Sequence, residues 1–116
     1  MIDLDGRLLD FATATLKLSN RLSRTPAGRY LSGQLMRSSA SAGANYQEAC
    51  GAESRADFVH KLQLVLKELR ESGYWVRLIA RSGLVSEGGL SELLDEAQQL
   101  VKILAKSVVT AKSRTR

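Results

Sequence analysis

Few side chains in this sequence combine the type and the spacing that catalysis requires. His60 is the single histidine, and it falls on the solvent side of its predicted helix. Cys50 stands near the C-terminal end of another predicted helix, where the helix dipole disfavours a thiolate. The His, Cys, Asp and Glu residues do not have the spacing of metal ligands, and the Glu-x-x-His repeats of di-iron bundles do not occur. We therefore expect a protein without enzymatic activity, metal or cofactor.

One acid, Glu48, stands at the edge of a strongly basic region and beside Asn45. A lone carboxylate of this kind is better suited to an ion pair than to acid–base chemistry, which needs a second converging group. Its possible partners are Arg37, Arg55 or a cation of a neighbouring chain. We expect an ion pair at Glu48 rather than a catalytic role.

The glycine-containing segments do not match a phosphate-binding loop. GRYLSGQ (28–34) ends in glutamine where the lysine of such a loop should stand. The stretch 34–52, QLMRSSASAGANYQEACGA, instead holds only small side chains between Ser38 and Ala44. Its small residues share one helical face with leucines, which predicts a seam where a neighbouring helix backbone comes close. That face consists of Leu31, Leu35, Ser38, Ser39, Ala42 and Asn45.

Composition favours one all-helical domain. At 116 residues with 44% hydrophobic side chains, the chain can bury a single core. Only 5% of the residues are aromatic, β-branched runs are scarce and Pro26 is the single proline, so the pattern favours helices over a sheet. A single cysteine excludes an internal disulfide and suits a reducing compartment. The N-terminus MIDLDGRLLD lacks an apolar run, and no window approaches the roughly 18 apolar residues of a membrane span, so we expect a cytoplasmic protein with no membrane partner.

Apolar periodicity and capping residues predict a single up-down-up-down four-helix bundle over residues 1–116. Thr25 and Pro26 open the second helix, Ser54 with Asp57 opens the third, and Ser86 is the predicted cap of the fourth. Gly51 is expected to supply a left-handed cap. Long helices joined by short turns must double back on one another. The expected helices span about 5–23, 27–50, 55–82 and 87–111, followed by a basic disordered tail at 112–116.

The third helix carries a second apolar row beside its core stripe. The core stripe is predicted to contain Phe58, Val59, Leu62, Val65, Leu66, Leu69, Ser72, Val76, Ile79 and Ala80. The second row lies about 100° away from it on the helix and suits a contact between subunits, in which its two acids would need Arg or Lys partners from the next chain. The alternative is that a loop of the same chain half-covers this row. The row consists of Leu64, Glu68, Glu71, Trp75 and Leu78.

The sequence resembles the bacterial four-helix-bundle family of proteins encoded in 23S rRNA intervening sequences. The resemblance rests on QLMRSSASAGANYQEA (34–49) and ESRADFVHKLQLVLKELRESGYWVRLI (53–79), and it extends weakly over nearly the whole chain. It implies a cytoplasmic homo-oligomeric ring, commonly a pentamer, and a similarity to the accessory variability protein of diversity-generating retroelements, which contacts a reverse transcriptase and nucleic acid. Gly43 departs from the family, because many members carry proline there, and a kink expected at this point is softer here. The positions that fall on the family motifs are Arg37, Ala44, Asn45 and Glu48 on the second helix and Glu68, Glu71, Tyr74 and Trp75 on the third.

Charge is strongly segregated along the chain, whose net charge is +5. Residues 11–47 and 97–116 contain ten basic residues and no acid. This pattern fits either solvated helix faces with basic ends or a surface for an anionic partner. In the predicted bundle, five arginines meet at one end and would bind RNA or DNA through phosphates with little sequence specificity, because no aromatic residues are seen to interleave with them. They are Arg21, Arg24, Arg29, Arg77 and Arg81.

The alternative function is a scaffold that holds a protein partner, such as a reverse transcriptase or a toxin, without binding nucleic acid directly. In that case the arginines would meet an acidic protein surface. Material that absorbs near 260 nm and co-purifies with the protein would favour nucleic acid, whereas a stoichiometric protein would favour the scaffold.

Overall fold

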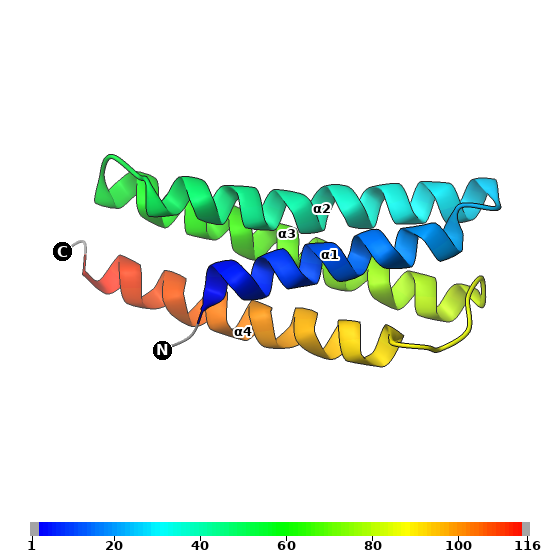
Figure 1. Cartoon of the computed structure of the whole chain (residues 1–116). Helices are drawn as coiled ribbons and strands as arrows, with labels where there is room; N and C mark the ends of the chain where they lie inside the picture. Colours follow the sequence, from blue (N-terminus) through cyan, green and yellow to red (C-terminus); the bar gives the residue numbers. More distant parts are fainter. Residues whose placement is uncertain (1–2, 115–116) are drawn as a thin grey trace.

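The chain folds into an antiparallel succession of long α-helices. The computed structural model describes residues 3–114, and within this range there are four helices and no strand. Figure 1 shows that the α1–α2 and α3–α4 connections lie at one end of the bundle, while the α2–α3 connection and both termini lie at the other. The predicted all-helical bundle is thus confirmed. The helices are α1 (Leu4–Leu22), α2 (Pro26–Cys50), α3 (Arg55–Ser82) and α4 (Leu90–Ser113).

The predicted start signals of α2 and α3 act as the sequence indicated. Thr25 has an extended backbone and its hydroxyl accepts from the Gly28 N–H at 2.9 Å, with Pro26 at the first helical position. The Ser54 hydroxyl accepts from the Asp57 N–H at 3.0 Å. Each cap satisfies a backbone donor that the first helical turn leaves unpaired.

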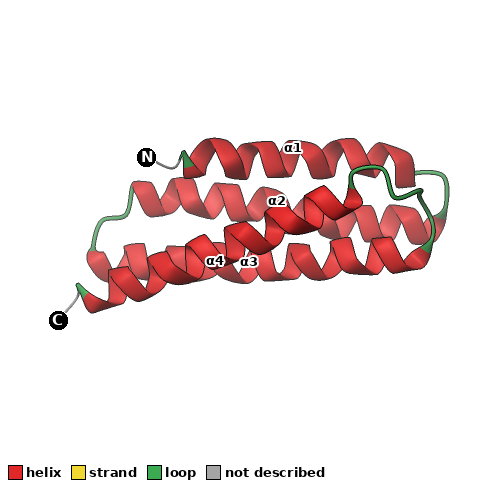
Figure 2. Cartoon of the chain, turned by 90° about the horizontal axis from the view of Figure 1, so that it is seen from below, coloured by secondary structure: helices red, strands yellow, loops and turns green. Residues whose placement is uncertain are grey.

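The fourth helix begins later than predicted and without the predicted cap. It starts at Leu90 rather than at residue 87, after Gly89 adopts a left-handed φ of 83°. Ser86 does not cap it; the Glu87 carboxylate instead accepts from the Ser91 N–H at 2.9 Å. Consecutive glycines disfavour helix, and the carboxylate reaches the same unpaired donors that a serine cap would reach. The α3–α4 connection, green in Figure 2, therefore runs over residues 83–89 and is longer than predicted.

Two further predictions about helix ends were wrong. Gly51 has a φ of −102° and supplies no left-handed cap, whereas Gly83 at the end of α3 does so with a φ of 71°. The chain after residue 111 is not a disordered tail over its whole length, because α4 continues to Ser113. Arg114 caps the end of α4, and the last two residues of the predicted tail, Thr115 and Arg116, lie outside the described residues.

The small-residue stretch is a helical packing seam, as predicted. Ser38 and Ala42 are fully buried in α2, which runs unbroken through Gly43. The Ser38 hydroxyl lies 2.8 Å from that of Ser72 on α3, and the Ser39 hydroxyl lies 2.7 Å from that of Thr15 on α1. Small side chains therefore let α1 and α3 approach the two sides of α2. Asn45 lies half-buried at the seam's edge, where its amide donates to the Ser41 carbonyl.

The packing is uneven around the bundle. Helix α1 packs along α2, α2 along α3, and α3 along α4, whereas α1 and α4 come close at few positions. The molecule is elongated, with extents of 50 × 21 × 20 Å. The two sides of α4 therefore differ: it is closely packed on α3 and separated from α1 by a groove.

Candidate nucleic-acid interface

The five arginines predicted to meet at one end are carried by elements that converge there. Arg21 lies in the last turn of α1, Arg24 in the connection that follows and Arg29 in the first turns of α2. Arg81 lies in the last turn of α3 and Arg77 one turn before it. All five side chains are exposed. Antiparallel packing brings these termini to the same end because each helix reverses the direction of the previous one (Figure 1).

Two of these arginines hold the connections in place. Arg21 donates to the Gly88 carbonyl at 2.9 Å and to the Ser86 carbonyl at 3.0 Å, which ties α1 to the α3–α4 connection. Arg29 donates to the Ser23 carbonyl at 3.1 Å. Their positive charge remains, but part of their hydrogen-bonding capacity is used within the chain.

The other three arginines are available to an anion. Within residues 3–114, Arg24, Arg77 and Arg81 form no ion pair with a carboxylate. Arg24 lines a hollow of about 530 Å³ at the end of the bundle, together with Asn20 and Thr25. Unpaired, exposed guanidinium groups beside polar donors are suited to phosphate oxygens.

The structure shows a basic strip on α3 that the sequence reasoning missed. Its members recur at steps of four and three residues, so they share one flank of the helix, and all are exposed. The signal was present in RESGYWVR (70–77), where an aromatic stands between arginines at i−4 and i+3. The sequence reasoning looked for aromatics only among the five arginines of one end, and it therefore overlooked Tyr74 between Arg70 and Arg77. The basic strip consists of Lys67, Arg70, Tyr74, Arg77 and Arg81.

The opposite flank of α3 carries the acids, and their partner comes from the same chain. Arg37 of α2 pairs with Glu68 at 3.3 Å and also with Glu71. The Trp75 indole N–H donates to the Glu71 carboxylate at 2.9 Å. The expectation that these acids need cations from a neighbouring subunit is corrected, because α2 presents Arg37 directly to them.

The second apolar row is partly covered within the monomer. Leu64, Trp75 and Leu78 are half-buried, and Trp75 and Leu78 pack against the core. Tyr30 of α2 and Tyr74 both meet the Trp75 ring edge-on, with centroid distances of 6.1 and 5.1 Å. A neighbouring helix, rather than a loop, covers this row.

Glu48, a residue of the family motif, forms a different ion pair from those predicted. Its carboxylate accepts from the Lys61 ammonium at 2.6 Å, and this hydrogen bond raises the pKa of Lys61. Neither Arg37 nor Arg55 pairs with it, because α3 presents Lys61 to this part of α2. Ala44 is exposed and has no polar side chain to contribute.

The side chains weighed for catalysis lie on the surface. His60 and Cys50 are both exposed. Burial and the neighbouring Cys50 raise the pKa of Tyr46, which disfavours the tyrosinate rather than activating it. Among residues 3–114, no group of three or more His, Cys, Asp and Glu side chains could hold a metal ion.

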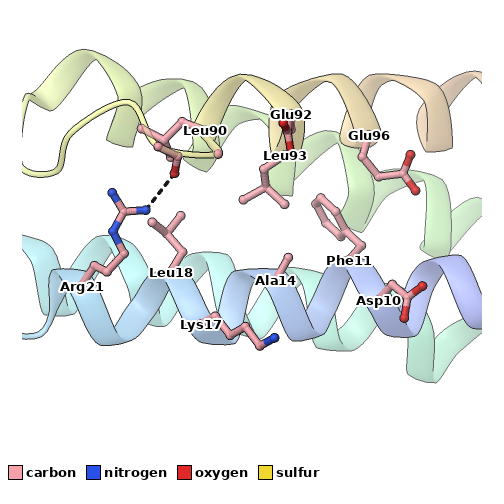
Figure 3. Close-up of a pocket in the computed structure, with 12 residues that line it drawn as sticks. Asp10, Phe11, Ala14, Lys17, Leu18, Arg21, Leu90, Glu92, Leu93 and Glu96 are labelled. Atoms are coloured by element: carbon pink, nitrogen blue, oxygen red, sulfur yellow. Dashed lines mark hydrogen bonds between the residues drawn. The ribbon is translucent and has the colours of Figure 1, made fainter.

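The groove between α1 and α4 has an apolar floor and is closed by polar contacts at its ends. Figure 3 shows Phe11, Leu18 and Leu93 in the space between the two helices and Arg21 reaching the α3–α4 connection. At the other end Arg7 pairs with Glu96 at 2.6 Å, and this hydrogen bond raises the pKa of Arg7. The groove encloses about 380 Å³ and is better suited to apolar contact than to reaction chemistry.

The helices of the described range are unlike membrane spans. None of them combines the length and the apolar character needed to cross a bilayer.

Comparison with known proteins gives a family and a close structural relative. The model of the 23S rRNA-intervening sequence protein family matches residues 7–106. The chain is also similar to a crystal structure of a protein of unknown function from the S23 ribosomal protein family of Bacteroides thetaiotaomicron. The two are 31% identical with a TM-score of 0.83, and the match covers 90% of this chain and 97% of the other. Comparison with curated proteins gave no significant match.

Proposed function

The chain belongs to the 23S rRNA-intervening sequence protein family, and from this premise we propose that it is a non-catalytic, self-associating bundle that binds nucleic acid. The proposed binding surface is the basic end of the bundle, where five arginines lie: Arg21, Arg24, Arg29, Arg77 and Arg81. The observation that carries the proposal is the set of exposed arginines at this end that lack carboxylate partners within residues 3–114: Arg24, Arg77 and Arg81. Structured RNA is the preferred ligand, because the family is named for a segment of ribosomal RNA. We place this function in the cytoplasm.

Self-association would multiply a weak phosphate contact. A ring of subunits, which the family resemblance implies to be a pentamer, would present the basic end in several copies. Linked copies bind with much greater avidity than one copy, provided that their geometry permits simultaneous contact. Binding of this kind loses affinity steeply with salt, because each neutralised phosphate releases counterions.

A salt series with two matched double variants tests the proposal. Arg24→Gln with Arg81→Gln should weaken binding to structured RNA and lower the log–log salt slope by about 1 for each phosphate contact removed. The control is Arg55→Gln with Lys106→Gln, which makes the same change in charge at the opposite end of the bundle and should have a smaller effect. Equal effects from the two pairs would indicate nonspecific attraction and contradict the assignment to this end.

A protein scaffold is the second candidate function, favoured by exposed apolar side chains. Leu9 and Leu16 are 65% and 54% exposed, and the α1–α4 groove adds an apolar floor beside another flank of α1. Surfaces of this kind usually mark protein contacts. If the purified protein carries a stoichiometric protein and no nucleic acid, the scaffold function is favoured.

A further inference from the structure

The groove between α3 and α4 is lined by cations, an aromatic ring and apolar side chains. Arg70, Tyr74 and Arg77 of the basic strip border it on one side, and Lys102 of α4 borders it on the other. Its volume is about 580 Å³, within the usual range of small-ligand sites, and its floor is apolar. The space beside Gly73 is open, because a Cβ placed there would meet no atom within 4 Å.

The charged side chains that line this groove are all positive. The lining contains no acid, and within residues 3–114 its cations Arg70, Arg77 and Lys102 form no ion pair. The nearby acid Glu71 lies on the other flank of α3, where Arg37 and Trp75 hold it. The groove therefore suits an anionic ligand that also has an apolar surface.

Tyr74 presents an aromatic ring that is already held in place. Its side chain is 49% exposed, yet its ring meets Trp75 edge-on at 5.1 Å and 74°. Trp75 is itself fixed by its hydrogen bond to Glu71 and by Tyr30. A held ring between two arginines is a stacking platform that loses little conformational entropy when a base binds.

We propose that the α3–α4 groove binds unpaired nucleotides of a single strand, with a base stacked on Tyr74 and its flanking phosphates bound by Arg70, Arg77 and Lys102. A duplex fits this groove poorly, because its bases are already stacked within the helix and only its backbone is presented. This inference rests on the proposed function and names the class of nucleic acid. The basic end and the groove share Arg77, so a strand could pass from one to the other.

Paired binding measurements test the proposal on the full chain. The probes are a fluorescent oligouridylate and an RNA duplex with the same number of phosphates, each measured across a salt series. Tyr74→Ser should weaken oligouridylate binding about tenfold, as expected for the loss of one base–aromatic stack, and change duplex binding by less than about twofold. Tyr74→Phe keeps the ring and should bind like the wild type. Far-UV circular dichroism and urea unfolding of each variant verify the fold.

The outcomes separate this inference from the proposed function. If Tyr74→Ser binds oligouridylate as the wild type does, or weakens both probes equally, base stacking in the groove is overturned, whereas the basic end is judged separately by the Arg24 and Arg81 variants. A poly-glutamate peptide is a third probe, and it tests whether the groove binds an acidic protein segment instead. If it binds and loses affinity in Arg70→Gln with Lys102→Gln, while oligouridylate does not bind at all, the groove takes an acidic protein segment and the proposal is wrong.

Discussion

At the scale of single residues, the buried serines illustrate how side-chain size can matter more than hydrogen bonding. Ser38 of α2 is fully buried against α3, and its hydroxyl contacts both the Ser72 hydroxyl and the Leu35 carbonyl. Ser72 also has the Glu68 carbonyl at 2.9 Å, so it keeps an acceptor if the Ser38 hydroxyl is removed. The small volume at this position is therefore the property that the packing requires.

Substitutions at Ser38 test this argument. Ser38→Ala should cost less than about 1 kcal/mol, because no buried donor is left unpaired. Ser38→Val should cost about 1–3 kcal/mol, because extra methyl groups overpack the seam. Urea unfolding measures both, and Ala40→Val on the exposed side of α2 controls for helix propensity, worth up to about 0.7 kcal/mol. Equal costs for Ser38→Val and Ala40→Val would show that α2 and α3 are not closely packed here.

At the scale of elements, the start of α4 is stabilised by a side-chain hydrogen bond that does not come from the N-cap residue. Gly89 precedes the helix in a left-handed conformation and has no side chain with which to cap it. Glu87 supplies the missing acceptor to the Ser91 N–H, and its negative charge lies at the positive end of the helix dipole. Ser86, the residue that the sequence pattern favoured, instead offers its carbonyl to Arg21.

The contribution of this carboxylate is measurable. Glu87→Ala should destabilise the protein by about 0.5–2 kcal/mol, the range for loss of a capping side chain, and should increase amide exchange at Ser91. Ser86→Ala is the matched control and should have little effect, because it removes only the long, exposed hydrogen bond of 3.4 Å from Arg21 to the Ser86 hydroxyl and keeps the Ser86 carbonyl that accepts from Arg21 at 3.0 Å. Hydrogen exchange followed by NMR distinguishes local fraying of α4 from global unfolding. A larger effect from Ser86→Ala would favour the serine cap that the sequence pattern indicated.

At the scale of the whole molecule, the position of exposed apolar side chains changes the expected contact between subunits. The row on α3 is half-buried by α2, and its acids are paired within the chain. Leu9 and Leu16 are more exposed and lie seven residues apart, so they share one flank of α1. A subunit contact would bury more new apolar surface at this flank of α1 than at the row on α3.

Native mass measurements can compare these surfaces. We expect Leu9→Ser with Leu16→Ser to lower the mass of the assembly measured by light scattering, because the two substitutions remove exposed apolar surface from the contact. Trp75→Ala with Leu78→Ala should lower the mass less and should also reduce stability, because both side chains pack against the core. If only the second pair changes the mass, the α3 row is the interface, as the sequence pattern first predicted. An unchanged mass in both would exclude both surfaces.

The helices and much of the core were predictable because they depend on local features of the chain. Apolar period, Thr25–Pro26 and Ser54 specify where helices run and begin, and these features act within a few residues. The start of α4 was less predictable, because Gly89, Ser86 and Glu87 offer competing ways to satisfy the same backbone groups. Which of them prevails depends in part on Arg21, a residue distant in the sequence.

The sequence by itself determined the helical class, the family, the small-residue seam and the gathering of basic residues at one end, because periodicity, composition and helix order suffice for these. Only the tertiary structure decided how the charged residues are used. It paired Arg37 with Glu68 and Glu71, and Lys61 with Glu48, and it tied Arg21 to the α3–α4 connection. These choices depend on which helix flanks face one another, and a contact between distant residues is set by packing across the bundle rather than by spacing along the chain.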